Sequence, residues 1–151
     1  MTEKYSKDYK HFDNLIWQLP GWSTAIFVLS ITGLSQIAGG NLDCLNLGFS
    51  TEEIAFGFLL VCWFFHMALF NALVRFRAHQ IELKSDGNSA FAHWCYSGQF
   101  WLQNAVIIQS GALFFLAIRI IKLDFAIVSS IVVMLAMFIY SLLSIYIKGK
   151  K

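Results

Sequence analysis

Between Asp124 and Lys148 the chain reads FAIVSSIVVMLAMFIYSLLSIYI, residues 125–147, without one charged side chain. A helix needs about 20 consecutive, mostly apolar residues to cross the roughly 30 Å hydrocarbon core of a bilayer, and this stretch is long enough. Three more charge-free gaps lie between Asp13 and Asp43, between Glu53 and Arg75, and between Asp86 and Arg119. The sequence therefore predicts an all-α integral membrane protein with four transmembrane helices, at about residues 21–38, 54–74, 100–118 and 125–147.

The composition supports a membrane protein with a single domain. The chain has 151 residues, of which 58% are hydrophobic and only 13% are charged, whereas about 25% of the residues of a soluble domain are charged. The four gaps use nearly the whole length, so we expect one four-helix transmembrane domain over residues 1–151. Ser50 and Glu53 have the spacing of a capping box, which indicates that the second helix begins there.

The segment before the first span has an amphipathic pattern. Tyr5, Tyr9, Phe12 and Ile16 recur at helical spacing, while the lysines fall on other faces. We therefore expect an N-terminal interfacial helix over about residues 3–18, lying in the membrane surface. Pro20 is expected to bend this helix into the first span.

The basic residues predict the orientation, because cytoplasmic flanks of membrane proteins collect lysine and arginine. With four spans, nine of the eleven basic residues share the side that holds both termini, and only Arg119 and Lys122 fall on the other side. The prediction is a multi-pass protein of the inner membrane with both termini in the cytoplasm. The basic residues are explained by this topology, so no direct nucleic-acid binding is expected.

The third span carries a polar face. Gln99, Gln103 and Ser110 share one side at helical spacing, and Asn104 and Gln109 flank it. Amides in hydrocarbon must find hydrogen-bond partners. Two interpretations stay open: these side chains form the interface between packed helices, or they line or gate a pore in a homo-oligomer.

The other intramembrane polar residues are His66 in the second span and Thr32 and Gln36 in the first. A histidine at this depth is a candidate proton relay, metal ligand or gate, and the alternative is a neutral imidazole bonded across a helix interface. The other histidines map to the cytoplasmic side and show no tight ligand spacing. We therefore expect no metal site and no cofactor.

The second and third helices are expected to project beyond the membrane. Helical character continues over residues 74–84 and again over 89–100, so the two helices can form a cytoplasmic hairpin. This hairpin is a candidate docking surface for a partner protein or a small signalling ligand, although its aromatic residues also suit a second aromatic belt. The candidate docking residues are Arg75, Arg77, Lys84, Phe91 and Trp94.

The sequence argues against an enzyme. The cysteines, Cys44, Cys62 and Cys95, fall in an outer loop, a span and the cytoplasmic side, so no two of them can pair as a thiol-disulfide enzyme requires. None of the short catalytic motifs is present, and no carboxylate lies within a span. Conduction, gating and assembly remain as roles for the uncharged polar residues.

Residues 9–22, YKHFDNLIWQLPGW, resemble the lead-in of small uncharacterised bacterial four-span membrane proteins, some of which are membrane effectors in antiviral defence. The resemblance implies a channel-like or membrane-permeabilising role that a partner holds silent, and it assigns no role to a single residue. The first hypothesis is thus an oligomeric effector or channel under partner control. The alternatives are a non-catalytic anchor or scaffold subunit that recruits a partner protein, and an immunity-type protein that blocks a foreign pore-former.

Overall fold

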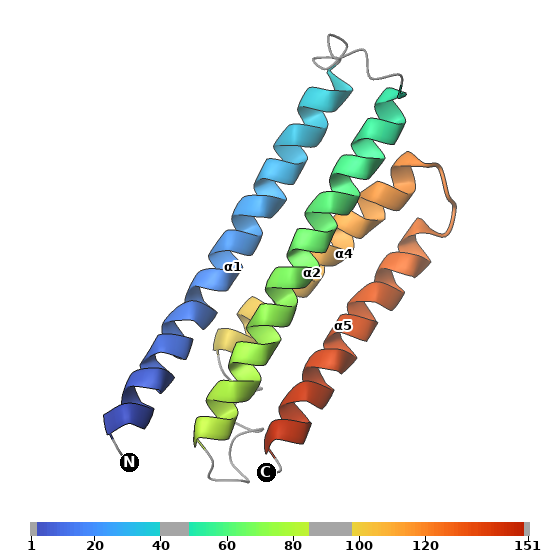
Figure 1. Cartoon of the computed structure of the whole chain (residues 1–151). Helices are drawn as coiled ribbons and strands as arrows, with labels where there is room; N and C mark the ends of the chain where they lie inside the picture. The colour runs from blue at the N-terminus through green and yellow to red at the C-terminus, as the bar shows by residue number, and fades with distance from the viewer. Residues whose placement is uncertain (1–2, 40–48, 85–97, 150–151) are drawn as a thin grey trace.

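The computed structural model describes residues 3–39, 49–84 and 98–149, and within these ranges it contains helices and no strand. The helices are α1 (Glu3–Ala38), α2 (Thr51–Lys84), α4 (Gly98–Ile120) and α5 (Ala126–Gly149) (Figure 1). Each is long and apolar enough to cross a membrane, over Lys10–Ala38, Thr51–Ile81, Gly98–Ile120 and Ala126–Ile147. The four apolar helices predicted from the charge-free gaps are therefore confirmed.

The helices form an elongated bundle with α2 and α4 as its central pair (Figure 1). α1 and α5 each pack against both members of this pair. The two chain termini lie at the same end of the bundle (Figure 1), which we call the terminal end. The opposite end holds the start of α2 and the turn between α4 and α5, and we call it the loop end.

The expected bend at Pro20 is not seen, because α1 is one straight helix from Glu3 to Ala38 (Figure 1). Proline removes one backbone hydrogen bond and crowds the preceding turn, which is why a bend was expected. The side chains beside it are held in the core, where Ile16 is 1% exposed and Leu19 is 4% exposed. Packing of this segment against α2 and α4 thus outweighs the local cost of the proline.

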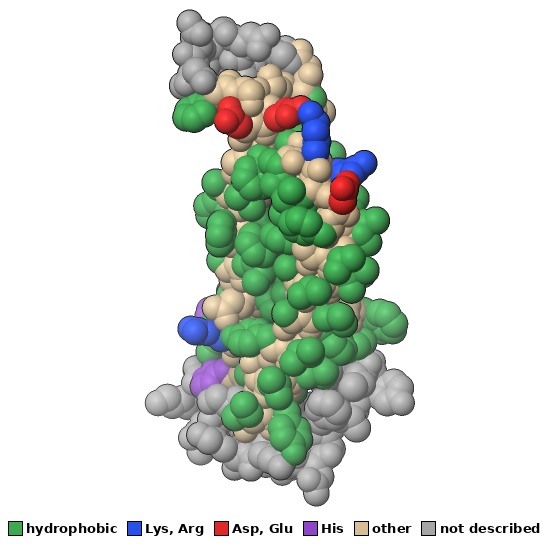
Figure 2. All heavy atoms as spheres, turned by 90° about the vertical axis from the view of Figure 1, so that its right-hand side faces the viewer, with side chains coloured by type: hydrophobic (Ala, Val, Ile, Leu, Met, Phe, Trp, Pro, Cys, Tyr) green, Lys and Arg blue, Asp and Glu red, His purple; other side chains and the backbone are tan. Residues whose placement is uncertain are grey.

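The buried apolar side chains form two main clusters. Ile16, Phe70 and Met137 belong to the cluster nearer the terminal end, and Leu59 and Leu113 belong to the one nearer the loop end. Large hydrophobic side chains also cover the outside of the bundle (Figure 2), and only 22% of the most apolar stretch of α5 is buried within the chain. Such an exterior suits hydrocarbon rather than water.

The charged side chains gather toward the two ends of the bundle (Figure 2). At the loop end the predicted capping box is confirmed: the N–H of Ser50 donates to Glu53 Oε2 (2.7 Å), and the N–H of Glu53 donates to Ser50 Oγ (3.2 Å). Lys122, in the turn after α4, has a positive φ of 60° and an ion pair of 3.0 Å with Glu52. This contact connects the turn to the first residues of α2.

Candidate functional site

The candidate site is the row of polar side chains along α4, which the bundle turns toward the other three helices. At the terminal end, Gln99 Nε2 donates to Asp13 Oδ1 of α1 (3.0 Å). Gln80 Nε2 of α2 donates to the same oxygen (2.9 Å), and Gln80 Oε1 accepts from Arg77 Nη1 (2.6 Å). We call these four residues the terminal polar cluster. One carboxylate thus joins α1, α2 and α4.

One helical turn further along α4, Gln103 faces α5. Its Nε2 donates to Ser141 Oγ, and both side chains are buried, at 3% and 0% exposure. The neighbouring Asn104 points elsewhere, because its Nδ2 donates to the Phe100 carbonyl of its own helix (3.0 Å). Gln103 therefore connects two helices, whereas Asn104 only satisfies its own backbone.

Gln109 connects α4 to α1 near the middle of the bundle. Its Oε1 accepts from Ser23 Oγ (2.8 Å) and its Nε2 donates to Thr24 Oγ1 (3.0 Å), so both ends of the amide are used. The adjacent Ser110 is buried and contacts α2, where its hydroxyl lies 3.7 Å from Met67 Sδ. The amide and the hydroxyl fix α4 against two different helices.

His66 of α2 is fully buried beside this amide, and its ring meets Phe27 of α1 in a T-shaped contact (centroids 6.5 Å apart). Gln109, the backbone of Ser23 and the Cys62 carbonyl lie near the imidazole. Neither ring nitrogen has a hydrogen-bond partner of acceptable geometry among the described residues. We call His66, Gln109, Ser23 and Thr24 the central polar cluster.

The structure does not bring every predicted site residue to this interior. Thr32 is exposed and its hydroxyl donates to the Val28 carbonyl of its own helix (3.0 Å), and Gln36 is exposed one turn further along. Of the predicted docking residues, Arg75 is exposed, Arg77 belongs to the terminal polar cluster, and Lys84 is the last residue of α2. The expected extension of α2 to Lys84 is therefore confirmed. The remaining two, Phe91 and Trp94, lie outside the described residues.

Several residues of the interior escaped the sequence analysis as site residues. Asp13 was used only as the boundary of a charge-free gap, and Gln80 fell within the expected extension over residues 74–84. Ser23, Thr24 and Ser141 are hydroxyl residues within apolar runs. Ser23 and Thr24 directly follow the Trp22 at the start of the first span, so a hydroxyl pair there was the one available signal. Which residue of α4 each hydroxyl contacts depends on how the helices pack, and no local sequence pattern indicates it.

Within residues 3–39, 49–84 and 98–149, no group of three or more His, Cys, Asp or Glu side chains could hold a metal ion. Comparisons of the chain with protein-family models, with curated proteins and with solved structures found no match. What the site can do therefore follows from its geometry: it fastens helices together and encloses one histidine.

Proposed function

We propose that this protein is a non-catalytic scaffold subunit of the inner membrane, which holds a partner protein at its terminal end. The observation that supports this proposal is that the polar side chains of α4 have partners on the other helices. Gln99, Gln103, Gln109 and Ser110 each contact a side chain on another helix of the same chain. An unpaired polar group in hydrocarbon costs several kcal/mol. Groups paired inside the chain need no aqueous path and no neighbouring subunit, and of these four residues Gln99 alone has a buried atom, Oε1, without a partner.

The basic residues support the orientation in this proposal. Nine of the eleven lysines and arginines belong to the segments at the terminal end, which predicts that this end faces the cytoplasm. Lys10 and Arg75 are exposed there and can meet an acidic partner. The apolar exterior between the two ends would lie in the lipid.

Leakage from liposomes tests the scaffold proposal. Purified wild-type protein at high density is expected to leave membrane potential and dye retention normal, with and without the products of neighbouring genes. Gln103→Leu is expected to change the free energy of unfolding by less than about 1 kcal/mol and to leave the membrane tight. Asn104→Leu is the matched control, because Asn104 bonds only its own helix.

Leakage caused by the wild-type protein would overturn the scaffold proposal. It would favour the second candidate, an oligomeric effector or channel that a partner controls, possessing the antiviral role that the resemblance of residues 9–22 implies. The observation in favour of this candidate is His66. A scaffold has no need of a fully buried imidazole whose two nitrogens lack partners among the described residues, and intramembrane ionisable groups often mark ion or proton pathways.

The second candidate makes its own prediction. In a leaking homo-oligomer, Gln103→Leu and His66→Leu should both reduce the leak while the chain still inserts, whereas Asn104→Leu should not. A stable monomer in mild detergent would count against this candidate, because the polar face of α4 in a single four-helix chain cannot line a pore wide enough for ions.

A further inference from the structure

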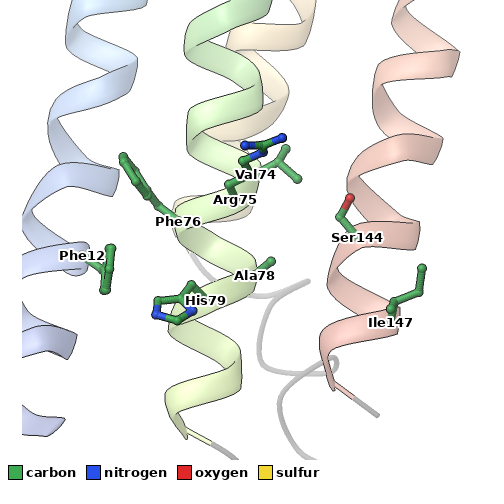
Figure 3. A pocket seen from close by; sticks show the side chains of 8 residues that line it. All are labelled: Phe12, Val74, Arg75, Phe76, Ala78, His79, Ser144 and Ile147. Carbon is green, nitrogen blue, oxygen red and sulfur yellow. The ribbon is translucent and has the colours of Figure 1, made fainter. Parts of the chain in front are cut away.

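A groove follows the seam between α2 and α5 on the outside of the bundle. Its mid-span part has a volume of about 620 Å³ and mainly apolar walls, which include Trp63. At its end toward the terminal part, the Tyr140 hydroxyl donates to Asn71 Oδ1 (2.8 Å) across the seam. Its terminal part has a volume of about 550 Å³ and is lined on this seam by Val74, Arg75, Ala78, Ser144 and Ile147. It also extends across α2 to His79 of α2 and Phe12 of α1 (Figure 3). Val74 follows Asn71 by three positions and Ser144 follows Tyr140 by four, so the terminal part begins about one helical turn beyond the Asn71–Tyr140 pair.

The length of the groove matches one leaflet of a bilayer. At 1.5 Å per residue, the twelve positions from Trp63 to Arg75 rise about 18 Å, and half of the hydrocarbon core is about 15 Å thick. By the same measure Ile54 and Val74 are about 30 Å apart along α2, which is the whole core. Arg75 then lies at the edge of the hydrocarbon, at the depth where lipid phosphates begin.

Arg75 supplies a positive charge at the end of this groove. Its guanidinium is exposed, points toward the α5 side of α2 (Figure 3), and has no hydrogen bond or ion pair to any described residue. No carboxylate is among the residues that line the groove, and the nearby Asp13 is occupied by Gln80 and Gln99 in the interior. The mouth of an apolar groove thus carries a cation that lacks an anion.

We propose that the α2–α5 groove binds an anionic phospholipid, with the phosphate on the Arg75 guanidinium and one acyl chain along the seam. Arginine pairs well with phosphate oxygens, and basic pockets between membrane helices bind lipid head groups. A second copy of this chain in the same orientation would bring another Arg75 to this depth, whereas a lipid phosphate brings the anion that Arg75 lacks among the described residues. Charge complementarity therefore favours the lipid. This inference does not depend on whether the protein is a scaffold or a channel.

Lipid retention measured by native mass spectrometry tests this proposal. The protein is extracted from vesicles of equal parts phosphatidylglycerol and phosphatidylcholine, and the bound lipids are counted. The wild type is expected to retain phosphatidylglycerol about fivefold over phosphatidylcholine, which corresponds to about 1 kcal/mol for one basic residue at an anionic surface. Arg75→Gln should abolish this preference. Lys10→Gln is the matched control, because Lys10 also carries one positive charge and is exposed but does not line the groove.

A second variant tests the acyl chain. Ala136 lines the mid-span part and is exposed, so Ala136→Phe should fill the groove and reduce retention of both lipids without removing a core contact. Glycerol phosphate, a head group without chains, should not compete. Equal retention of the two lipids by the wild type would overturn the proposal, as would equal effects of Arg75→Gln and Lys10→Gln. Efficient disulfide formation between copies of an Ala136→Cys variant in phosphatidylglycerol membranes would also overturn it, because a second copy would then cover the seam.

Discussion

The hydrogen bond from Gln103 to Ser141 predicts an unequal response to removing either partner. Other buried serines of this bundle bond their own helix: the hydroxyls of Ser30 and Ser130 donate to the backbone carbonyl four residues earlier, at 2.6 and 2.7 Å. Ser141 can do the same when Gln103 is replaced by leucine. The Gln103 amide is 3% exposed and reaches for α5, so Ser141→Ala leaves it buried without its partner.

The expected changes in the free energy of unfolding follow from the cost of leaving a buried polar group unpaired. Gln103→Leu should change the free energy of unfolding by less than about 1 kcal/mol, because leucine is of similar size and the freed hydroxyl finds a carbonyl. Ser141→Ala should cost about 1–3 kcal/mol, the penalty for a buried polar group left unpaired. The double variant should be close to Gln103→Leu alone, since both polar partners are then gone. The coupling energy then equals the cost of Ser141→Ala, about 1–3 kcal/mol, above the average of about 0.6 kcal/mol for hydrogen bonds in bilayers.

A double-mutant cycle measures this coupling. Reversible unfolding of the wild type, both single variants and the double variant in bicelles gives the four free energies. Ser129→Ala is the control, because the Ser129 hydroxyl donates only within its own helix, and it should cost less than Ser141→Ala. Additive single effects, within about 0.3 kcal/mol, would refute the pairing, as would a larger loss from Gln103→Leu than from Ser141→Ala.

Two further substitutions test the ends of the bundle in the same unfolding assay. Asp13→Ala should lower the free energy of unfolding by about 2 kcal/mol, because two glutamine amides lose a charged acceptor. Asp13→Asn keeps an acceptor oxygen and should recover about half of that loss. Equal losses from the two variants would contradict the hydrogen bonds from Gln80 and Gln99 to Asp13. Lys122→Gly should stabilise the protein by about 1 kcal/mol, because glycine relieves the positive φ while the exposed ion pair with Glu52 contributes little. Lys122→Ala removes the same ion pair and keeps the backbone strain, so it should give no gain; a gain equal to that of glycine would contradict this explanation.

The four helices could be predicted from the sequence because the exclusion of charge from hydrocarbon is a local rule. Each charge-free gap, such as the one between Asp124 and Lys148, meets the length requirement alone. The capping box at Ser50 and Glu53 is equally local, since both partners lie within one turn. Features that depend only on a few neighbouring residues could therefore be predicted from the sequence.

The bend at Pro20 was predicted wrongly, because the path of the helix at this proline depends on distant residues. The local preference of proline was correct, but Ile16 and Leu19 pack into a core shared with Phe70 of α2 and Val106 of α4. Contacts so far apart in the chain leave no spacing signal in the first helix. The path of α1 was thus decided by tertiary packing.

Only the α4 side of the candidate site could be predicted from the sequence. Helical spacing placed Gln99, Gln103 and Ser110 on one face, and the structure turns that face inward. Their partners, such as Ser141 and Asp13, could not be predicted, because a hydrogen bond between helices depends on where the helices meet. Periodicity describes one helix at a time and contains no such information.

The unbroken α1 has a consequence for the membranes that this protein can occupy. Its 36 residues measure about 54 Å, far more than a hydrocarbon core of about 30 Å. A free helix of this length would adapt to a thin bilayer by leaning over. α1 is fastened by Asp13 at one level and by Ser23 and Thr24 at another, so it cannot lean without its neighbours. A change in bilayer thickness would therefore tip the bundle as one rigid body, and the exposed terminal end would move with it.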